Sequence, residues 1–260
     1  MNQMQTPELV TATLDQGVLT LTLGAGKAHP LSLAMIRAFH AALKAAAENP
    51  DARVLVIHGP GHIFCAGHDL KEIARHNADP DNGAAFLREL FEACGEMMQA
   101  VHFHPLPTIA MVEGIATAAG LQLVAACDLA FATHDATFCL PGVKNGGFCT
   151  TPAVAVSRAV GRKHLMQLAL SAAPQSADWA LRAGLVNELT APEDLATLTY
   201  DFAKTLATRN PGAIADGKRA IYTHLDMALP DAYTMATEVM IGHFMDPSRL
   251  EYDKDTRWSK

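Results

Sequence analysis

Residues 107–132 read PTIAMVEGIATAAGLQLVAACDLAFA, and this stretch decides the fold. Its opening letters, PTIAMVEG, form a continuous apolar run of strand length, as does RVLVIHG at 53–59, and such runs are typical of strands covered on both faces. Between the two runs, AAFLRELFEACGEMMQAV at 84–101 predicts a long helix. The alternation of strand, loop and helix continues through DLAFATHDATFCL at 128–140, which indicates an α/β layer or spiral.

Outward from this centre, both ends of the chain show simpler patterns. LVTATLDQGVLTLTLG at 9–24 predicts a hairpin that turns at Asp15, Gln16 and Gly17. A helix is expected from a cap at Ser32 to Asn49. Beyond 184–189 the strand signals stop, and three amphipathic helices with wide apolar faces follow. We therefore predict a core of residues 1–195 and a helical region of 196–260 that packs on the body or on another subunit.

Composition limits the possible functions. Half of the 260 residues are hydrophobic and 18% are charged, which is globular, and no apolar run approaches the roughly 20 residues of a membrane span. The N-terminus lacks the features of a secretory signal or transit peptide, so a cytoplasmic location is expected. The five cysteines form no CxxC pair, and no metal site is expected. A net charge of −7 argues against nucleic acid as a partner, although a small anion held by a few local cations stays possible.

The small residues of GIATAAGL, at 114–121, allow another group to approach the backbone closely. If Thr117 caps a helix here, the N–H groups of Ala118, Ala119 and Gly120 are free at its N-terminus and form an anion site. The alternative is that small side chains only permit tight packing of helix on sheet. This stretch alone leaves both interpretations open.

A second stretch, GHIFCAGHDLKEI at 61–73, follows a strand end and starts another helix. Asp69 with Glu72 three residues later predicts a capping box. The glycine before the helix exposes the backbone N–H of His68, and Lys71 could face an anion from the same turn. The plainer interpretation is a strand-to-helix loop with a surface lysine.

Five stretches in register resemble the enoyl-CoA hydratase/isomerase, or crotonase, superfamily: HIFCAGHDLKE (62–72), the stretch 107–132, TFCLPGVKNGGF (137–148), 155–189 and the helical tail. The resemblance covers nearly the whole chain. It implies a crotonase-like spiral of ββα turns with a C-terminal α-helical trimerisation region, assembled as a homotrimer or a dimer of trimers. It also implies an acyl-CoA thioester as ligand, and no cofactor beyond its CoA moiety.

The resemblance assigns roles to particular positions. His68 and Ala119 match the two residues whose backbone N–H groups hold the thioester oxygen, and two donors in a dry site stabilise the enolate that forms there. Two segments match those that bind CoA. Their residues are Lys27, Ala28 and His29 in the first, and Ala66, His68, Asp69, Leu70 and Lys71 in the second.

The chain departs from the family at its acid–base pair. Hydratases carry two glutamates that position and deprotonate a water, and the matching residues here are Gln122 and Gly142. An amide accepts no proton at neutral pH and glycine has no side chain. In this departure the chain resembles one branch of the superfamily, the enoyl-CoA hydratase domain-containing proteins.

The polar groups expected near the acyl end are Gln122, Cys149, Thr150 and Thr151. Cys149 is either a nucleophile or a buried thiol, and the buried thiol is favoured because no histidine or lysine adjoins it in sequence. Two functions stay open: an acyl-CoA enzyme that stabilises an enolate without the glutamates, and a non-catalytic acyl-CoA binder. An acidic side chain in the pocket would favour the enzyme, and Glu113 is the nearest candidate.

Overall fold

The computed structural model describes residues 8–24, 26–247 and 249. The expectation of a cytoplasmic location rests on the N-terminal stretch. Residues 1–7, which make up most of that stretch, lie outside the described range. The chain forms two compact units, one of residues 1–104 and 108–208 and the other of residues 105–107 and 209–260.

The strands of the first unit form two sheets. The six-stranded sheet has the order β1 (Val10–Asp15), β2 (Val18–Leu23), β3 (Val54–His58), β5 (Thr108–Val112), β7 (Leu129–Thr133) and β10 (Glu188–Thr190). The four-stranded sheet has the order β4 (Ile63–Cys65), β6 (Ile115–Thr117), β8 (Thr137–Cys139) and β9 (Gln175–Ser176). Neighbours are parallel except for β1 with β2 and β8 with β9.

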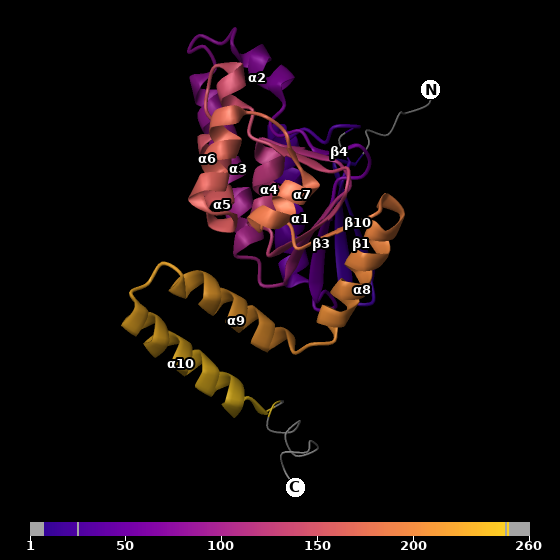
Figure 1. Ribbon diagram of the computed structural model, residues 1–260, viewed down its shortest axis with the longest axis vertical. Helices are drawn as coiled ribbons and strands as arrows, with labels where there is room; N and C mark the ends of the chain where they lie inside the picture. Colours follow the sequence, from indigo (N-terminus) through magenta and orange to yellow (C-terminus); the bar gives the residue numbers. More distant parts are fainter. Residues whose placement is uncertain (1–7, 25, 248, 250–260) are drawn as a thin grey trace. The chain divides into compact units, whose positions relative to one another are not determined.

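The helices and short 3-10 turns lie between these strands or, from η2 onward, after the last of them (Figure 1). They are α1 (Leu33–Glu48), α2 (Leu70–His76), α3 (Ala84–His102), α4 (Ala119–Ala126), η1 (Gly142–Asn145), α5 (Thr150–Ala159), α6 (Arg162–Ser171), α7 (Ala177–Ala183), η2 (Pro192–Asp194), α8 (Leu195–Ala207), α9 (Pro211–His224) and α10 (Leu229–Met245).

One connection repeats three times along the chain. A strand of the large sheet is followed by a strand of the small sheet and then by helix: β3, β4 and α2 with α3; β5, β6 and α4; β7, β8 and, after η1, α5. Because each repeat advances one place in both sheets, the chain winds as a spiral. The predicted α/β spiral of ββα turns is confirmed.

Near the N-terminus, the hairpin turn and the cap of α1 also form as predicted. The hairpin between β1 and β2 turns through Gln16 and Gly17, both with positive φ (49° and 82°), and glycine adopts this conformation at little cost. The Ser32 hydroxyl accepts the N–H of Met35, which caps α1, and Asn49 ends that helix.

The large sheet buries one face against α8. Leu195 and Ala203 of this helix join a cluster with Val54, Val56 and Ile109 of the central strands, and Figure 1 shows α8 lying along the sheet. The first compact unit therefore continues through α8 to residue 208, past the predicted end of the core at 195. The apolar face of α8 therefore packs on the large sheet of the same chain.

The second unit contains α9 and α10, which pack on each other. None of the α10 side chains is buried, and both helices expose large apolar groups. The most exposed are Leu225, Leu229, Tyr233 and Met245, at 67%, 71%, 69% and 65%. Met240 and Phe244 of α10 are exposed by 57% and 52%.

Within the described residues, no helix combines the length and apolar character that crossing a bilayer requires.

Candidate active site

The candidate site residues follow three neighbouring parallel strands of the small sheet. The loop after β4 carries Ala66 and His68, α4 begins after β6 at Ala119, and Gly142 lies shortly after β8. The carboxyl ends of parallel strands meet at one edge of a sheet, where α/β proteins commonly bind ligands. The fold therefore brings together segments that lie far apart in the sequence.

Glycines let the first two of these segments touch. A Cβ on Gly67 would lie 3.0 Å from the backbone nitrogen of Ala119 and 3.0 Å from Cβ of Ala118. A Cβ on Gly120 would lie 2.0 Å from the carbonyl oxygen of Cys65. Backbone approaches of this kind exclude side chains, which explains the small residues of 114–121. The sequence left open either tight packing or exposed N–H groups; the structure shows the tight packing, which is compatible with N–H groups exposed beside it.

The start of α4 differs from the prediction. Thr117 is the last residue of β6, so it does not cap the helix, and the N-cap is Ala118. Thr117 stays in the strand because β6 pairs with β8 through that position, opposite Cys139. Ala118 has φ 52° and ψ −119°, a conformation that is strained for any residue with a Cβ. Ala119 is then the first helical residue, and its N–H has no partner within the helix.

The N–H of His68 is also directed away from its neighbouring strand. The short parallel bridge between Leu31 and His68 uses the carbonyl of Gly67 and the N–H of Asp69, at 2.8 and 3.3 Å. Alternate N–H groups of a strand point to opposite sides, so that of His68 does not face Leu31. The structure thus places the His68 and Ala119 backbones on adjoining loops.

The same bridge joins the two segments expected to bind CoA. The Ala66 N–H donates to the Ala28 carbonyl at 3.0 Å, so residues 28–31 run beside residues 66–69. His29 is buried with φ 44°, while Lys27 in this segment and Lys71 after the other are exposed. The two segments are therefore neighbours in space, and each has a lysine available to solvent.

Asp69 caps α2 as predicted, but the capping box does not form. The Asp69 carboxylate accepts the N–H groups of Lys71 and Glu72, at 2.9 and 3.3 Å. The Glu72 carboxylate accepts the Leu33 N–H instead, at 2.9 Å, because the Asp69 N–H already donates to Leu31. Glu72 thus ties α2 to the start of α1.

Burial favours the neutral forms of three titratable side chains at this sheet edge, His68, Cys139 and Cys149. Burial lowers the pKa of His68 to about 4, and its imidazole packs edge-on against Phe91 with ring centroids 5.1 Å apart. Burial also raises the pKa of Cys149, although a hydrogen bond with the Gly142 backbone opposes this. Burial raises the pKa of Cys139 as well, and the nearby Cys149 adds to the effect. A protonated thiol is a weak nucleophile. Cys149 is half-buried, however, and not buried as expected.

The backbone leaves no room for a side chain at Gly142. A Cβ there would lie 2.5 Å from the nitrogen of Cys149 and 2.7 Å from the carbonyl carbon of Phe148. The loop between β8 and α5 closes on itself through the Gly147 N–H, which donates to the Gly142 carbonyl at 3.0 Å. Glutamate cannot occupy this position unless the loop moves.

Gln122 lies one turn into α4 and is only 4% exposed. Its Oε1 is buried and has no hydrogen-bond partner among the described residues. Residues three apart share a helix face, so Gln122 lies on the face of Ala119. Helix α4 also packs against α5, whose N-cap is Cys149 and whose first residue is the exposed Thr150.

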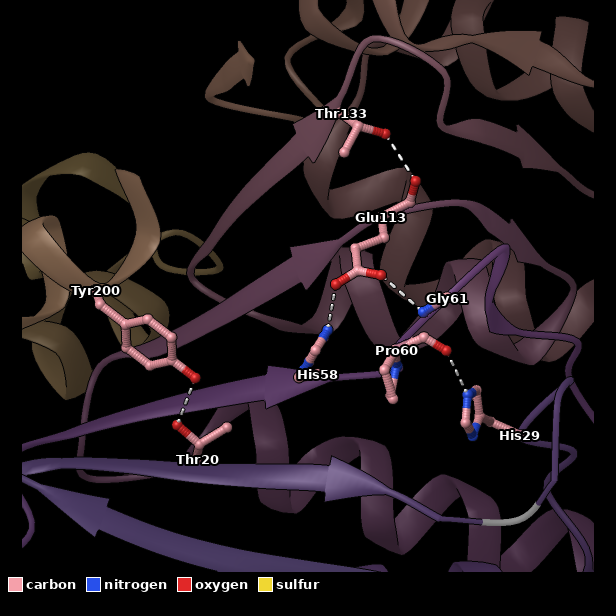
Figure 2. A network of polar contacts seen from close by, with 8 residues as sticks. All are labelled: Thr20, His29, His58, Pro60, Gly61, Glu113, Thr133 and Tyr200. Carbon is pink, nitrogen blue, oxygen red and sulfur yellow. Dashed lines mark hydrogen bonds and ion pairs between the residues drawn. The ribbon is translucent and has the colours of Figure 1, made fainter. Parts of the chain in front are cut away.

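Glu113, the acid considered for the pocket, belongs to a different network (Figure 2). Its carboxylate pairs with His58 Nε2 at 2.9 Å and accepts the Gly61 N–H at 2.7 Å. The Thr133 hydroxyl donates to the Glu113 carbonyl at 2.7 Å. Glu113 therefore fixes the loop after β3. Sequence reasoning missed His58, and the signal was its place at the end of an apolar strand.

Residue His29 is tied to the same loop, since its Nε2 donates to the Pro60 carbonyl at 3.0 Å (Figure 2). No set of three or more His, Cys, Asp or Glu side chains among the described residues is arranged to hold a metal ion.

Comparison with known proteins places this geometry in a family. The model of the enoyl-CoA hydratase/isomerase family matches residues 13–250, so the chain belongs to that family. Among curated relatives, an enoyl-CoA hydratase domain-containing protein 3 of Mus musculus, mitochondrial by its name, is 37% identical over 238 residues. The match covers 91% of this chain and 78% of that one, and it confirms the branch that the sequence resembled.

Solved structures agree. A crystal structure of an enoyl-CoA hydratase/isomerase family protein from Silicibacter pomeroyi has 56% sequence identity and a TM-score of 0.88, over 92% of this chain and 100% of that one. Human enoyl coenzyme A hydratase domain-containing protein 3 has 34% identity and a TM-score of 0.88, over 94% and 93%. These matches confirm the crotonase fold.

Proposed function

We propose that the protein binds an acyl-CoA thioester and stabilises its enolate through the backbone N–H groups of His68 and Ala119. The close approach at Gly67, where an added Cβ would lie 3.0 Å from the Ala119 nitrogen, carries this proposal, because it sets both N–H groups on adjoining backbones. Two preorganised donors in a site shielded from water favour an oxyanion strongly. The strained Ala118 beside them is typical of a functional site.

The CoA moiety binds along the paired segments. Lys27, Ala28 and His29 line one side, and Ala66 with residues 68–71 lines the other. The Ala66–Ala28 hydrogen bond supports this arrangement. Lys71 interacts with the CoA phosphates from the first turn of α2, where its exposed ammonium is free to reach an anion. The proposal requires no cofactor beyond the CoA moiety of the ligand.

The reaction generates the enolate without a protein carboxylate. Cleavage of a carbon–carbon bond at the α-carbon, as in decarboxylation, leaves its electron pair on the enolate, which the two N–H groups then hold. Neutral His68, with its lowered pKa, is a poor base, and Gln122 offers none. Gln122, Cys149 and Thr150 are the polar groups that surround the acyl end.

A non-catalytic acyl-CoA binder is the second candidate, and the loop at Gly142 favours it. The backbone of residues 148–149 fills the space in which a second acid would stand. A protein that had lost catalytic activity would keep its ligand-binding loops, whereas the space for the second acid would no longer be needed and could close.

The test is calorimetric titration with CoA, butyryl-CoA and crotonyl-CoA, together with an absorbance assay for crotonyl-CoA hydration. We expect thioester binding and negligible hydration, because general acid and base steps are each worth about 10²- to 10⁴-fold. Decarboxylation of a malonyl-type CoA thioester would favour the enzyme over the binder. Failure of CoA and every thioester to bind would refute both candidates, and robust hydration would show that the acid–base positions are assigned wrongly.

We further propose that α9 and α10 mediate assembly as a homotrimer or a dimer of trimers. The exposed Leu225, Leu229 and Tyr233 support this, since large apolar surfaces commonly mark subunit contacts. The cytoplasmic location stays a prediction.

A further inference from the structure

Glu113 and His29 bind opposite edges of one peptide group (Figure 2). The Glu113 carboxylate accepts the Gly61 N–H at 2.7 Å, and the His29 imidazole donates to the Pro60 carbonyl at 3.0 Å. This N–H and this carbonyl belong to the same planar, trans peptide, so they point in opposite directions and turn together. The position of the Glu113 carboxylate therefore affects where His29 finds its acceptor.

Packing does little to fix the orientation of this peptide group. Pro60, Gly61 and His62 are exposed. Gly61 has φ 92°, and a Cβ there would meet no atom of the described chain within 4 Å. The loop is tied at its ends, by β3 and by the Ile115 N–H, which donates to the His62 carbonyl at 2.9 Å. Because glycine in open space lets its peptide rotate, the two side-chain hydrogen bonds set the orientation between these ends.

The Glu113 side chain is itself well anchored. Its second carboxylate oxygen pairs with His58 Nε2 at 2.9 Å, and the Thr133 hydroxyl donates to its backbone carbonyl at 2.7 Å. His58 ends β3 and Thr133 ends β7, and these strands flank β5, which Glu113 directly follows. The carboxylate thus connects the large sheet to the exposed loop.

His29 holds a conformation that depends on its surroundings. It is 3% exposed and has φ 44°, which is uncommon for a residue with a Cβ and persists only where other contacts fix it. Beside it, the Ala28 carbonyl accepts the Ala66 N–H at 3.0 Å, and the His29 carbonyl accepts the Cys65 thiol at 3.3 Å. The conformation of His29 therefore influences how the two segments proposed to bind CoA pair with each other.

We propose that Glu113 is a positioning residue for CoA binding, and that it acts on residues 27–29 through the Pro60–Gly61 peptide and His29. This inference rests on the proposed function, because it assumes that residues 27–29 bind CoA. Without the carboxylate the peptide is free to rotate, and its carbonyl turns away from His29. The segment is then less ordered before it binds, and ordering it on binding costs affinity.

The experiment measures CoA affinity by isothermal titration calorimetry. Glu113→Ala should weaken CoA binding about fivefold, since the hydrogen bond that His29 loses is a neutral one. Glu113→Gln should keep the wild-type affinity, because the amide oxygen still accepts the Gly61 N–H and the amide NH₂ donates to an unprotonated His58 Nε2. Asp128→Ala is the matched control. The Asp128 carboxylate accepts the Thr108 N–H at 2.7 Å at the other end of β5, so its loss should destabilise the fold and leave CoA affinity unchanged.

A double-mutant cycle tests the route from Glu113 to the segment. His29→Phe keeps a buried ring and removes its N–H donor, so it should weaken CoA binding by a similar factor. Adding Glu113→Ala to His29→Phe should then cost little more, because both changes break the same connection. Should Glu113→Ala fail to fold, Glu113→Asn replaces it, since its side chain is one methylene too short for the same contacts.

Hydrogen exchange followed by mass spectrometry gives a second readout. Glu113→Ala should speed exchange in the peptides that contain Gly61 and Ala66, whereas Asp128→Ala should leave both unchanged. Wild-type CoA affinity in Glu113→Ala, equal loss in Glu113→Gln, or additive losses in the double variant would overturn the inference alone. Absence of CoA binding by the wild-type protein would instead refute the proposed function.

Discussion

Substitution of Gly67 by alanine tests the backbone arrangement on which the proposed site depends. Gly67 has φ 82°, and an added Cβ would meet three atoms at once: Ala118 Cβ at 3.0 Å, Ala119 N at 3.0 Å and Thr117 O at 3.1 Å. Two of the three are backbone atoms, so they cannot rotate away. Either the loop after β4 or the start of α4 must move by a few tenths of an ångström.

Gly184→Ala is the matched control. Gly184 has φ 81°, and its added Cβ would meet only the Ala159 carbonyl oxygen, at 3.8 Å. The left-handed conformation costs alanine about 1–2 kcal/mol at either position, and the entropy lost by the unfolded chain is also the same. Crowding adds about 1–3 kcal/mol at Gly67 only, by analogy with overpacked cores. We therefore expect Gly67→Ala to be less stable than Gly184→Ala by this amount.

Urea unfolding measures the two free energies, and calorimetry compares the binding of butyryl-CoA with that of CoA. Gly67→Ala should weaken butyryl-CoA binding more than CoA binding, because it displaces the Ala119 N–H. Gly184→Ala should weaken the binding of neither butyryl-CoA nor CoA, since Gly184 lies at the end of α7. Equal stability and equal thioester affinity of the two variants would refute the reasoning that these loops touch.

Three further predictions follow from the structure. The folded-state pKa of His68, about 4, lies below the ordinary histidine value of 6.5, so the unfolded state binds more protons and the stability that His68 contributes is lost as pH falls from 6.5 toward 4. His68→Asn should flatten this part of the pH profile in urea unfolding. Lys71→Glu should weaken CoA binding about tenfold and reduce its salt dependence, and unchanged affinity at low salt would remove Lys71 from the site. Mass measurement at micromolar concentration should find an oligomer, whereas Leu229→Glu with Tyr233→Glu should shift it toward monomer, and a monomeric wild-type protein would contradict the role of α9 and α10.

Local interactions account for what the sequence predicts well. The hairpin at Gln16 and Gly17, the Ser32 cap and the Asp69 cap all depend on residues within a few positions of each other. Apolar runs without alternation identify β3 and β5 as strands buried on both faces. Small residues between β6 and α4 indicate a close backbone approach, and the family motifs place His68 and Ala119 beside it.

Long-range packing decides what the sequence misses. Thr117 has the chemistry of a cap, but its pairing with Cys139 keeps it in β6, so Ala118 takes a strained conformation instead. Glu72 turns to Leu33 on a segment that is remote in sequence. Glu113 joins His58 and Gly61 because β3 and β5 are neighbours in the large sheet. Each outcome follows from a partner that only the folded chain brings near.

The sequence by itself therefore determined the ββα spiral and the family, and it predicts that Gln122 and Gly142 replace two glutamates. Periodicity, turn chemistry and motif spacing are properties of neighbouring residues, so they survive without a structure. Only the tertiary structure decided that no side chain fits at Gly142 and that Gln122 Oε1 is buried without a partner in the part of the chain that the structure describes. Excluded volume and hydrogen-bond satisfaction depend on atoms from distant segments, and their positions are set when the two sheets and their helices pack.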